Sequence, residues 1–163
     1  MSADGDIAGF DAVLATPLPG GWRVGVKMAN GQLLRVEFLP AATALLSPRA
    51  GASDAARQVA HYFSTQGGCS FSIPINGFGT PFQHRVWNAL REIPAGKTLT
   101  YGALAEQLGS SARAVAAACR ANRLPLVVPC HRVVAARGPG GFMGAVSGDA
   151  LDVKLWLLQH ESG

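Results

Sequence analysis

The sequence lacks any apolar run of about eighteen residues, the length that a membrane-spanning helix requires. Its first residues, Met1 to Asp6, also lack the basic and apolar regions of a signal peptide. The chain has 163 residues, of which 48% are hydrophobic, so it is long enough to bury a real core. We therefore expect one or two small domains with no membrane association.

Cysteine is scarce, and Cys69, Cys119 and Cys130 form an odd, widely spaced set. Such a set indicates free thiols in a reducing compartment rather than a disulfide framework. No cluster of cysteine and histidine has zinc-ligand spacing, and His61, Cys69 and His84 could meet only through folding. We therefore predict a cytoplasmic protein without a metal site.

Acidic residues are missing from a long stretch of the second half. Residues 1–79 contain five basic and five acidic residues, whereas residues 80–163 contain nine and five, which accounts for the whole net charge of +4. Between Glu106 and Asp149 there is no acid, and the bases there are Arg113, Arg120, Arg123, Arg132 and Arg137. A basic stretch suits a polyanion such as nucleic acid, and it equally suits a solvated surface.

The first half alternates between apolar and polar residues as half-buried strands do. The alternation predicts strands over 22–28 and 33–39, with a hairpin turn at Asn30-Gly31 and an end at Pro40. A helix starting near Ser53-Asp54 and running over 55–65 would turn three large side chains inward: Val59, Tyr62 and Phe63.

The segment after this helix separates two regions of different character. Residues 71–75 predict one more strand, and residues 76–79 are typical of a linker. We therefore expect an α/β (α+β) fold with a small sheet domain over 1–79 and a mainly helical domain over 80–163.

Helix signals dominate the second domain. Thr80, Pro81 and Gln83 form a capping box before a helix that ends near 93–96; its expected inward residues are Phe82, Val86, Trp87 and Leu90. Thr100 can cap a second helix that stops at Gly109, with Tyr101, Leu104, Ala105 and Leu108 inward.

A third helix follows closely and is unusual in composition. Ser110 or Ser111 can cap it, and it would run over 114–121. Two short helices joined by a turn that contains glycine suggest either a helix-turn-helix or an ordinary helical hairpin. The third helix consists mostly of small residues, so its backbone can approach another surface closely, and its flanking arginines favour nucleic acid as that surface.

The most informative stretch is Pro129-Cys130-His131-Arg132-Val133, which follows the apolar run 124–128. The proline disfavours continuing a helix or a sheet ladder through the thiol. We therefore expect Cys130 at the end of a buried segment, facing a pocket. Adjacency alone does not establish a hydrogen bond between Cys130 and His131.

This signature, at its spacing after Arg113-Ala114-Val115 and Asn122, resembles that of the O6-alkylguanine-DNA alkyltransferases, which are DNA repair methyltransferases. The resemblance runs from about Thr80 to Glu161. Residues 114–124 look closest to the C-terminal alkyltransferase domain of the bacterial adaptive-response protein. Residues 1–79 match only loosely, as the family's variable, ribonuclease H-like N-terminal domain.

The resemblance implies direct-reversal DNA repair by a methylated-DNA–protein-cysteine methyltransferase. Such a protein moves an alkyl group irreversibly from O6-alkylguanine, and also from O4-alkylthymine, to its own cysteine, once per molecule and without a cofactor. It implies binding of double-stranded DNA through the minor groove by the helix-turn-helix, with the damaged base flipped out of the stack. A monomer in the bacterial cytoplasm is expected.

The resemblance also assigns roles to single residues. Cys130 matches the alkyl acceptor, His131 the base that acts through a water, Glu161 the carboxylate that orients the histidine, and Asn122 the asparagine that holds the active-site loop. The residues matched to DNA or substrate contacts are Tyr101, Arg113, Ala114, Arg120, Arg123, Val133, Phe142 and Met143.

Three of the matched contacts have a specific form. Arg113 matches the arginine that fills the gap left by the flipped base, and the Tyr101 hydroxyl would reach the guanine. The backbone carbonyls of Cys130 and Val133 would accept from the exocyclic amine of the base. Arg132 is expected to be structural, tying the helix-turn-helix to the loop.

Two features depart from the family's pattern. In the loop over 141–146, Phe142 can stack on a base, but Met143 stands where the family often has a small polar residue near the guanine oxygen, and extra residues follow at 147–152. We expect Phe142 and Met143 to form an apolar wall over Cys130. The turn between Tyr101 and Arg113 is also shorter than in the family.

Three other functions stay open. An alkyltransferase-like protein binds lesions without repairing them, but that class replaces the acceptor cysteine, which argues against it here. A regulatory helix-turn-helix module would leave Cys130 merely buried. A Cys–His hydrolase would turn over repeatedly and needs an oxyanion hole, which no motif in this sequence marks.

Overall fold

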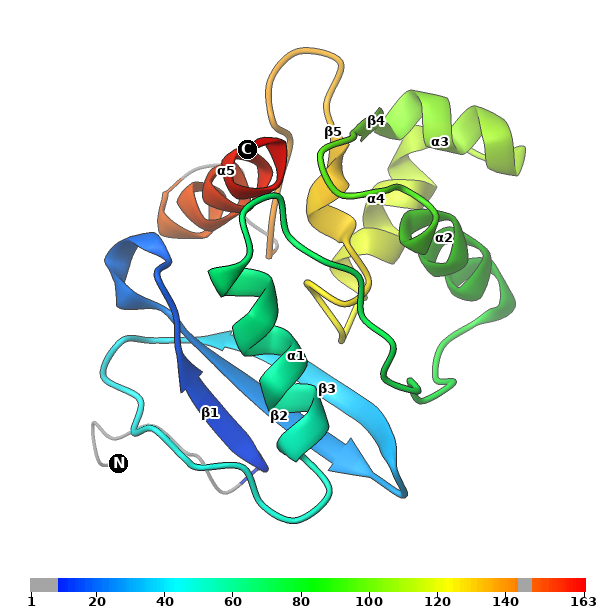
Figure 1. Ribbon diagram of the computed structural model, residues 1–163. Helices are drawn as coiled ribbons and strands as arrows, with labels where there is room; N and C mark the ends of the chain where they lie inside the picture. Colours follow the sequence, from blue (N-terminus) through cyan, green and yellow to red (C-terminus); the bar gives the residue numbers. More distant parts are fainter. Residues whose placement is uncertain (1–8, 144–147) are drawn as a thin grey trace. The chain divides into compact units, whose positions relative to one another are not determined.

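The computed structural model describes residues 9–143 and 148–163. Contacts along the chain divide it into two compact units, Met1–Gly77 and Phe78–Gly163, so the division falls at Gly77 rather than at residue 79. The first unit carries a sheet and a helix, and the second is mainly helical (Figure 1). The mixed α/β class expected from the sequence is confirmed.

The first unit is built on an antiparallel sheet in the order β1-β2-β3. β2 (Arg23–Ala29) and β3 (Gln32–Leu39) form the predicted hairpin, in which Ala29 pairs with Gln32. Asn30 and Gly31 both have positive φ, 52° and 77°, as a two-residue type I′ turn demands. The sequence analysis missed β1 (Ala12–Ala15), which pairs with β2, and the short 3-10 turn η1 (Pro19–Gly21).

Helix α1 (Ser53–Ser64) covers one face of this sheet (Figure 1). Its buried residues include Val59 and Tyr62, as predicted, whereas Phe63 is only half-buried. The ribonuclease H-like character of this unit stays a prediction.

The strand predicted over 71–75 is wrong. Only Ile75 forms a bridge, to Leu33, through bonds from Leu33 N to the Pro74 carbonyl (2.7 Å) and from Asn76 N to the Leu33 carbonyl (2.9 Å). Pro74 has no N–H to donate, so it cannot take part in a continuous ladder.

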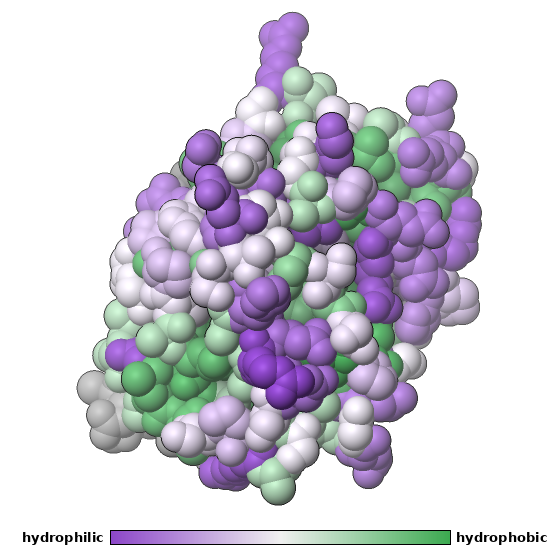
Figure 2. All heavy atoms as spheres, viewed as in Figure 1, coloured by the Kyte–Doolittle hydropathy of each residue, from purple (hydrophilic) through white to green (hydrophobic). Residues whose placement is uncertain are grey.

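The second unit begins with α2 (Pro81–Arg91), whose start matches its sequence signal. The Thr80 hydroxyl accepts from Gln83 N and the Gln83 side chain accepts from Thr80 N, which completes the capping box. Three of the four predicted inward residues are buried and Phe82 is half-buried; the buried ones are Val86, Trp87 and Leu90. Figure 2 shows hydrophilic side chains gathered over α2 and α3 on the face it presents.

Helices α3 (Tyr101–Leu108) and α4 (Ala112–Arg120) contact each other across the turn 109–111. Thr100 caps α3, Gly109 ends it in the left-handed conformation, and Ser111 caps α4. Leu104 and Ala105 are buried as predicted, whereas Tyr101 and Leu108 are half-buried. α4 starts before the predicted range of 114–121.

A parallel pair of very short strands, β4 (Leu99–Thr100) and β5 (Val133–Val134), was not predicted. Leu99 pairs with Val133 and Thr100 with Val134, so the start of α3 lies beside the segment that follows Cys130. The last helix, α5 (Asp149–Ser162), completes the unit and buries Val153, Lys154, Leu157 and Glu161. Within residues 9–143 and 148–163, no helix is long and apolar enough to cross a membrane.

The start of α4 allows a direct test of its cap. We expect Ser111→Ala to lower the free energy of unfolding by about 1 kcal/mol, because Ser111 Oγ accepts from Ala114 N at 3.1 Å. The neighbouring Ser110→Ala is the matched control, since Ser110 is exposed and is not the cap residue. Urea denaturation of both variants decides, and equal stabilities would contradict the assigned cap.

Candidate active site around Cys130

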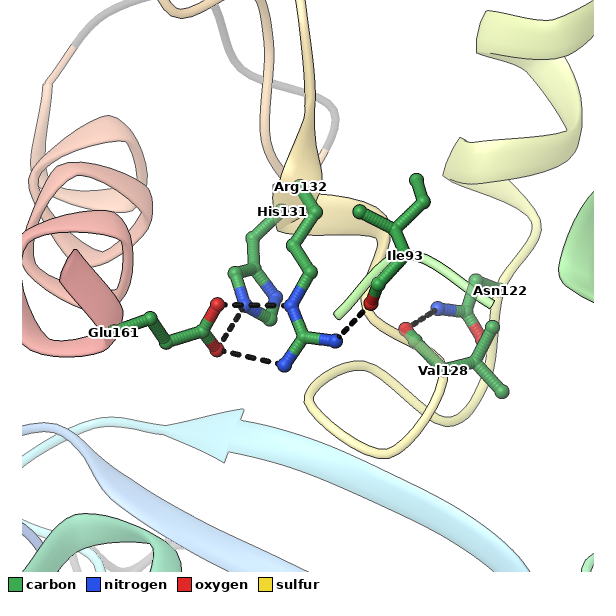
Figure 3. A network of polar contacts seen from close by, with 6 residues as sticks. All are labelled: Ile93, Asn122, Val128, His131, Arg132 and Glu161. Carbon is green, nitrogen blue, oxygen red and sulfur yellow. Dashed lines mark hydrogen bonds and ion pairs between the residues drawn. The ribbon is translucent and has the colours of Figure 1, made fainter. Parts of the chain in front are cut away.

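The apolar run before Cys130 is buried and is held by one amide side chain. Asn122 Nδ2 donates to the Val128 carbonyl at 2.9 Å, and Asn122 Oδ1 accepts from Leu124 N at 2.9 Å. Leu126 sits in this turn with a φ of 77°. Asn122 therefore holds the loop that leads to Cys130, and Figure 3 shows its hydrogen bond to Val128.

Cys130 opens a single 3-10 turn, η2 (Cys130–Arg132). In this turn Cys130 stays half-buried, whereas His131 and Arg132 are buried. Arg132 N donates to the Pro129 carbonyl at 3.0 Å, which closes the turn. His131 and Arg132 thus lie inside the unit while Cys130 is half-buried, and among the described residues no hydrogen bond joins the Cys130 and His131 side chains directly.

Glu161, from α5, is the centre of a buried polar network (Figure 3). Its Oε2 lies 2.7 Å from His131 Nε2. Arg132 donates through Nε to Oε1 at 2.8 Å and through Nη2 to Oε2 at 3.1 Å, and its Nη1 donates to the Ile93 carbonyl at 2.6 Å. Arg132 is therefore structural as expected, although it joins η2 to α5 and to the segment after α2.

The same network sets the protonation of His131. Burial lowers the pKa of its imidazole, Glu161 opposes this shift, and the charges of Arg132 and Lys154 lower the pKa further, with a net decrease. A neutral imidazole whose Nε2–H donates to Glu161 keeps its lone pair on Nδ1. That Nδ1 is buried and has no hydrogen-bond partner within the described part of the chain. Nδ1 is thus left to accept a proton, which agrees with the role that the family resemblance implies for His131.

The thiol needs such a base. Burial raises the pKa of Cys130, while a hydrogen bond from Asn122 and the positive charge of Lys154 favour the thiolate without reversing the shift. Cys130 is therefore protonated at neutral pH. A half-buried thiol next to a buried, neutral imidazole can act as a nucleophile once its proton is removed.

Lys154 of α5 was missed by the sequence analysis. Its side chain is fully buried, and Nζ donates to the Val133 carbonyl at 2.6 Å and to the Gly141 carbonyl at 2.9 Å. Burial lowers its pKa to about 8. The signal for its burial in the sequence was its position between Val153 and Leu155, in the apolar run up to Leu158. A lone cation that is buried with such a run needs hydrogen-bond partners inside the protein.

Comparison with known proteins decides the family. The family described as 6-O-methylguanine DNA methyltransferase, DNA binding domain, matches residues 81–163. The chain belongs to this family. A methylated-DNA–protein-cysteine methyltransferase of Shigella flexneri is 45% identical over 113 residues, which cover 68% of this chain and 62% of that protein.

Two further relatives extend the comparison. The bifunctional transcriptional activator and DNA repair enzyme Ada of Escherichia coli is 49% identical over 93 residues, 56% of this chain and 25% of Ada. The crystal structure of Mycobacterium tuberculosis OGT in complex with DNA has a TM-score of 0.72 at 31% identity and covers 92% of both chains. The resemblance stated from the sequence is confirmed.

Tyr101 lies at the start of α3 and packs on the loop after β5. A Cβ at Gly140 would lie 2.9 Å from the Tyr101 ring, so this close approach requires glycine, whose φ is 78°. Burial is the main cause that raises the pKa of Tyr101 to about 12. The hydroxyl therefore stays protonated and can donate.

The remaining predicted contact residues differ in exposure. Arg113 and Arg120 are exposed on α4, Ala114 is half-buried there, and the exposed Arg123 places its guanidinium 4.9 Å from the Phe78 ring centroid. Arg123 thus has a packing partner that the sequence did not indicate.

The carbonyls proposed to read the base are already engaged. The Val133 carbonyl accepts from Lys154, and the Cys130 carbonyl accepts from Val133 N. Because a carbonyl has two lone pairs, both can accept a second bond.

The loop after these residues carries Phe142, which is buried, and Met143, which is 42% exposed with a φ of 52°. The wall over Cys130 stays a prediction, and residues 144–147 lie outside the described residues. Of the extra residues expected at 147–152, Asp149 to Asp152 form the start of α5. Within the described ranges no group of three His, Cys, Asp or Glu side chains could hold a metal ion, and all three cysteines are free.

The role of Arg132 in the network is testable by stability. We expect Arg132→Met to lower the free energy of unfolding by about 3–5 kcal/mol, because it leaves Glu161 buried without its cation. The control is Arg57→Met, which breaks the exposed pair with Asp54 and should cost less than about 1 kcal/mol. Urea denaturation gives both values, and an equally small loss for Arg132→Met would remove Glu161 from the centre of the network.

Proposed function

We propose that this protein is a single-turnover DNA alkyltransferase that moves an alkyl group from O6 of guanine to Cys130. The observation that carries the proposal is the half-buried Cys130 thiol beside His131, whose Nε2 is bonded to Glu161 and whose Nδ1 is left to accept a proton. Family membership supplies the reaction class. The chain spans about half to two thirds of the length of the first curated relatives it matches, so the whole activity is proposed rather than transferred.

The reaction follows from these groups. The Cys130 thiol gives its proton through a water to His131 Nδ1, and the sulfur attacks the alkyl carbon. The S–C bond forms as the C–O6 bond breaks, and the electron pair leaves with guanine, which takes up the released proton by way of His131. Tyr101 can donate a hydrogen bond to the departing base, since its pKa is raised to about 12. Water cannot displace the thioether sulfur, so each molecule reacts once.

The proposed substrate is double-stranded DNA with O6-alkylguanine, and also O4-alkylthymine, approached through the minor groove. Exposed Arg113 and Arg120 on a helix of small residues support contact with a phosphate-lined groove. The crystal structure of the M. tuberculosis relative with DNA supports DNA as the partner. A monomeric state and a cytoplasmic location stay predictions.

The acceptor is tested by intact-protein mass spectrometry after incubation with DNA containing O6-methylguanine. We expect one methyl group per molecule, located on Cys130, and none in Cys130→Ala, which should still bind the DNA. Cys69→Ala is the matched control and should be methylated like the parent protein. A methyl group on Cys69 or Cys119, or repeated turnover, would contradict the assignment of Cys130 as the acceptor. Binding without transfer in the parent protein would favour a lesion-binding module.

A variant of Arg113 distinguishes a role in base flipping from a role in alkyl transfer. If its exposed side chain fills the vacated stack, Arg113→Ala should slow repair of duplex DNA at least about tenfold, a loss of about 1.4 kcal/mol. The same variant should react normally with free benzylguanine, which leaves no vacancy. Arg57→Ala, in the other unit, is the control for loss of charge. Equal losses on both substrates would make Arg113 a structural residue.

A further inference from the structure

Lys154 is a buried cation that the reaction above uses only as a charge near the thiol. Its two hydrogen bonds connect opposite ends of one segment, because Val133 precedes the turn over 134–140 and Gly141 follows it. One ammonium group thereby closes the segment that leads from Cys130 to Phe142.

Both acceptors of Lys154 are neutral backbone carbonyls, so neither cancels its charge. The groups that face it come from three elements: Cys130 and His131 from η2, Cys119 from α4, and Tyr101 from α3, whose ring centroid lies 5.7 Å from Nζ. Among them, the thiol of Cys130 is the group that must become an anion in the proposed reaction.

We propose that Lys154 is a positioning residue of the transfer site, which holds the segment 133–141 closed and favours the Cys130 thiolate through its positive charge. The reaction it serves rests on the proposed function, whereas its electrostatic effect on Cys130 can be measured without alkylated guanine.

The charge interaction between Lys154 and Cys130 is reciprocal, and this determines the direction in which each pKa shifts. The Lys154 charge lowers the pKa of Cys130 relative to burial alone, and the Cys130 thiolate raises the pKa of Lys154 relative to burial alone. Removing the charge of either group must therefore shift the pKa of the other. A purely structural lysine would show neither shift.

The first experiment measures the reaction of Cys130 with iodoacetamide against pH, resolved by peptide mass spectrometry. Lys154→Gln removes the charge but keeps hydrogen-bond donors, Lys154→Met removes both, and Lys154→Arg keeps both. We expect about tenfold slower reaction at neutral pH for the Gln and Met variants, which is one unit of thiol pKa, with equal rates at high pH. The Arg variant should restore the parent rate. Lys97→Met, at an exposed lysine of the same unit, should change nothing.

The second readout is the half-saturating concentration of free benzylguanine in single-turnover kinetics. We expect it to rise several-fold in Lys154→Met, where the segment is no longer held, and less in Lys154→Gln. Raising the pH should recover the maximal rate of both variants but not the half-saturating concentration. An unchanged half-saturating concentration in folded Lys154→Met would overturn the role in holding the segment.

The third experiment uses the parent sequence, so it remains informative even if the Lys154 variants do not fold. The sequence has three lysines, Lys27, Lys97 and Lys154, so ¹³C-labelled lysine gives three signals to titrate. Lys154 should titrate near 8, and its midpoint should rise after carboxymethylation of Cys130 with iodoacetate, which places a permanent anion there, with mass spectrometry verifying that Cys119 is intact. The neutral carboxamidomethyl adduct of Cys130 is the control and should raise it less. The other two midpoints serve as internal controls and should stay fixed.

A Lys154 midpoint that does not rise on carboxymethylation of Cys130, or a thiol profile unchanged in folded Lys154→Gln, would overturn the electrostatic role. These outcomes are distinct from a failure of the proposed function, which would appear only as absence of transfer from alkylated DNA.

Discussion

The second unit depends on one buried carboxylate. Glu161 lies on α5 with its side chain 1% exposed, where an ion without partners would be costly. Arg132 supplies the opposite charge through two bonds, and His131 supplies a third contact. Because Arg132 also bonds the Ile93 carbonyl, satisfying one carboxylate joins the last helix, the 3-10 turn of the thiol and the segment after α2.

This network also explains why His131 and Cys130, the proposed base and nucleophile, are both neutral at rest. Glu161 balances Arg132, so a proton on His131 would add a third cation beside Arg132 and Lys154, in a site where burial already disfavours charge. The thiol is likewise kept protonated by burial. Proton transfer from the neutral Cys130 thiol to the neutral His131 imidazole would create a thiolate and an imidazolium, and Glu161 beside His131 favours the imidazolium.

Three polar side chains donate hydrogen bonds to the carbonyls of irregular backbone around the site. The segments that carry Val128, Ile93, Val133 and Gly141 have few ladder partners, and buried carbonyls without partners are destabilising. Asn122, Arg132 and Lys154 donate to these four carbonyls. The thiol, the base and the loop after them are thus positioned by side chains rather than by regular secondary structure.

The features that could be predicted from the sequence are those whose signals lie within a few residues. The Asn30-Gly31 turn, the Thr80 capping box and the Gly109 stop are local, and each appears where predicted. Asn122, Cys130, His131 and Glu161 were named through the family's signature. Tertiary structure alone decided the β4–β5 pairing, the failure of a strand over 71–75 and the burial of Lys154. A two-residue strand is stabilised only by partners distant in the chain, and an apolar run that contains a lysine does not reveal which distant carbonyls its ammonium binds.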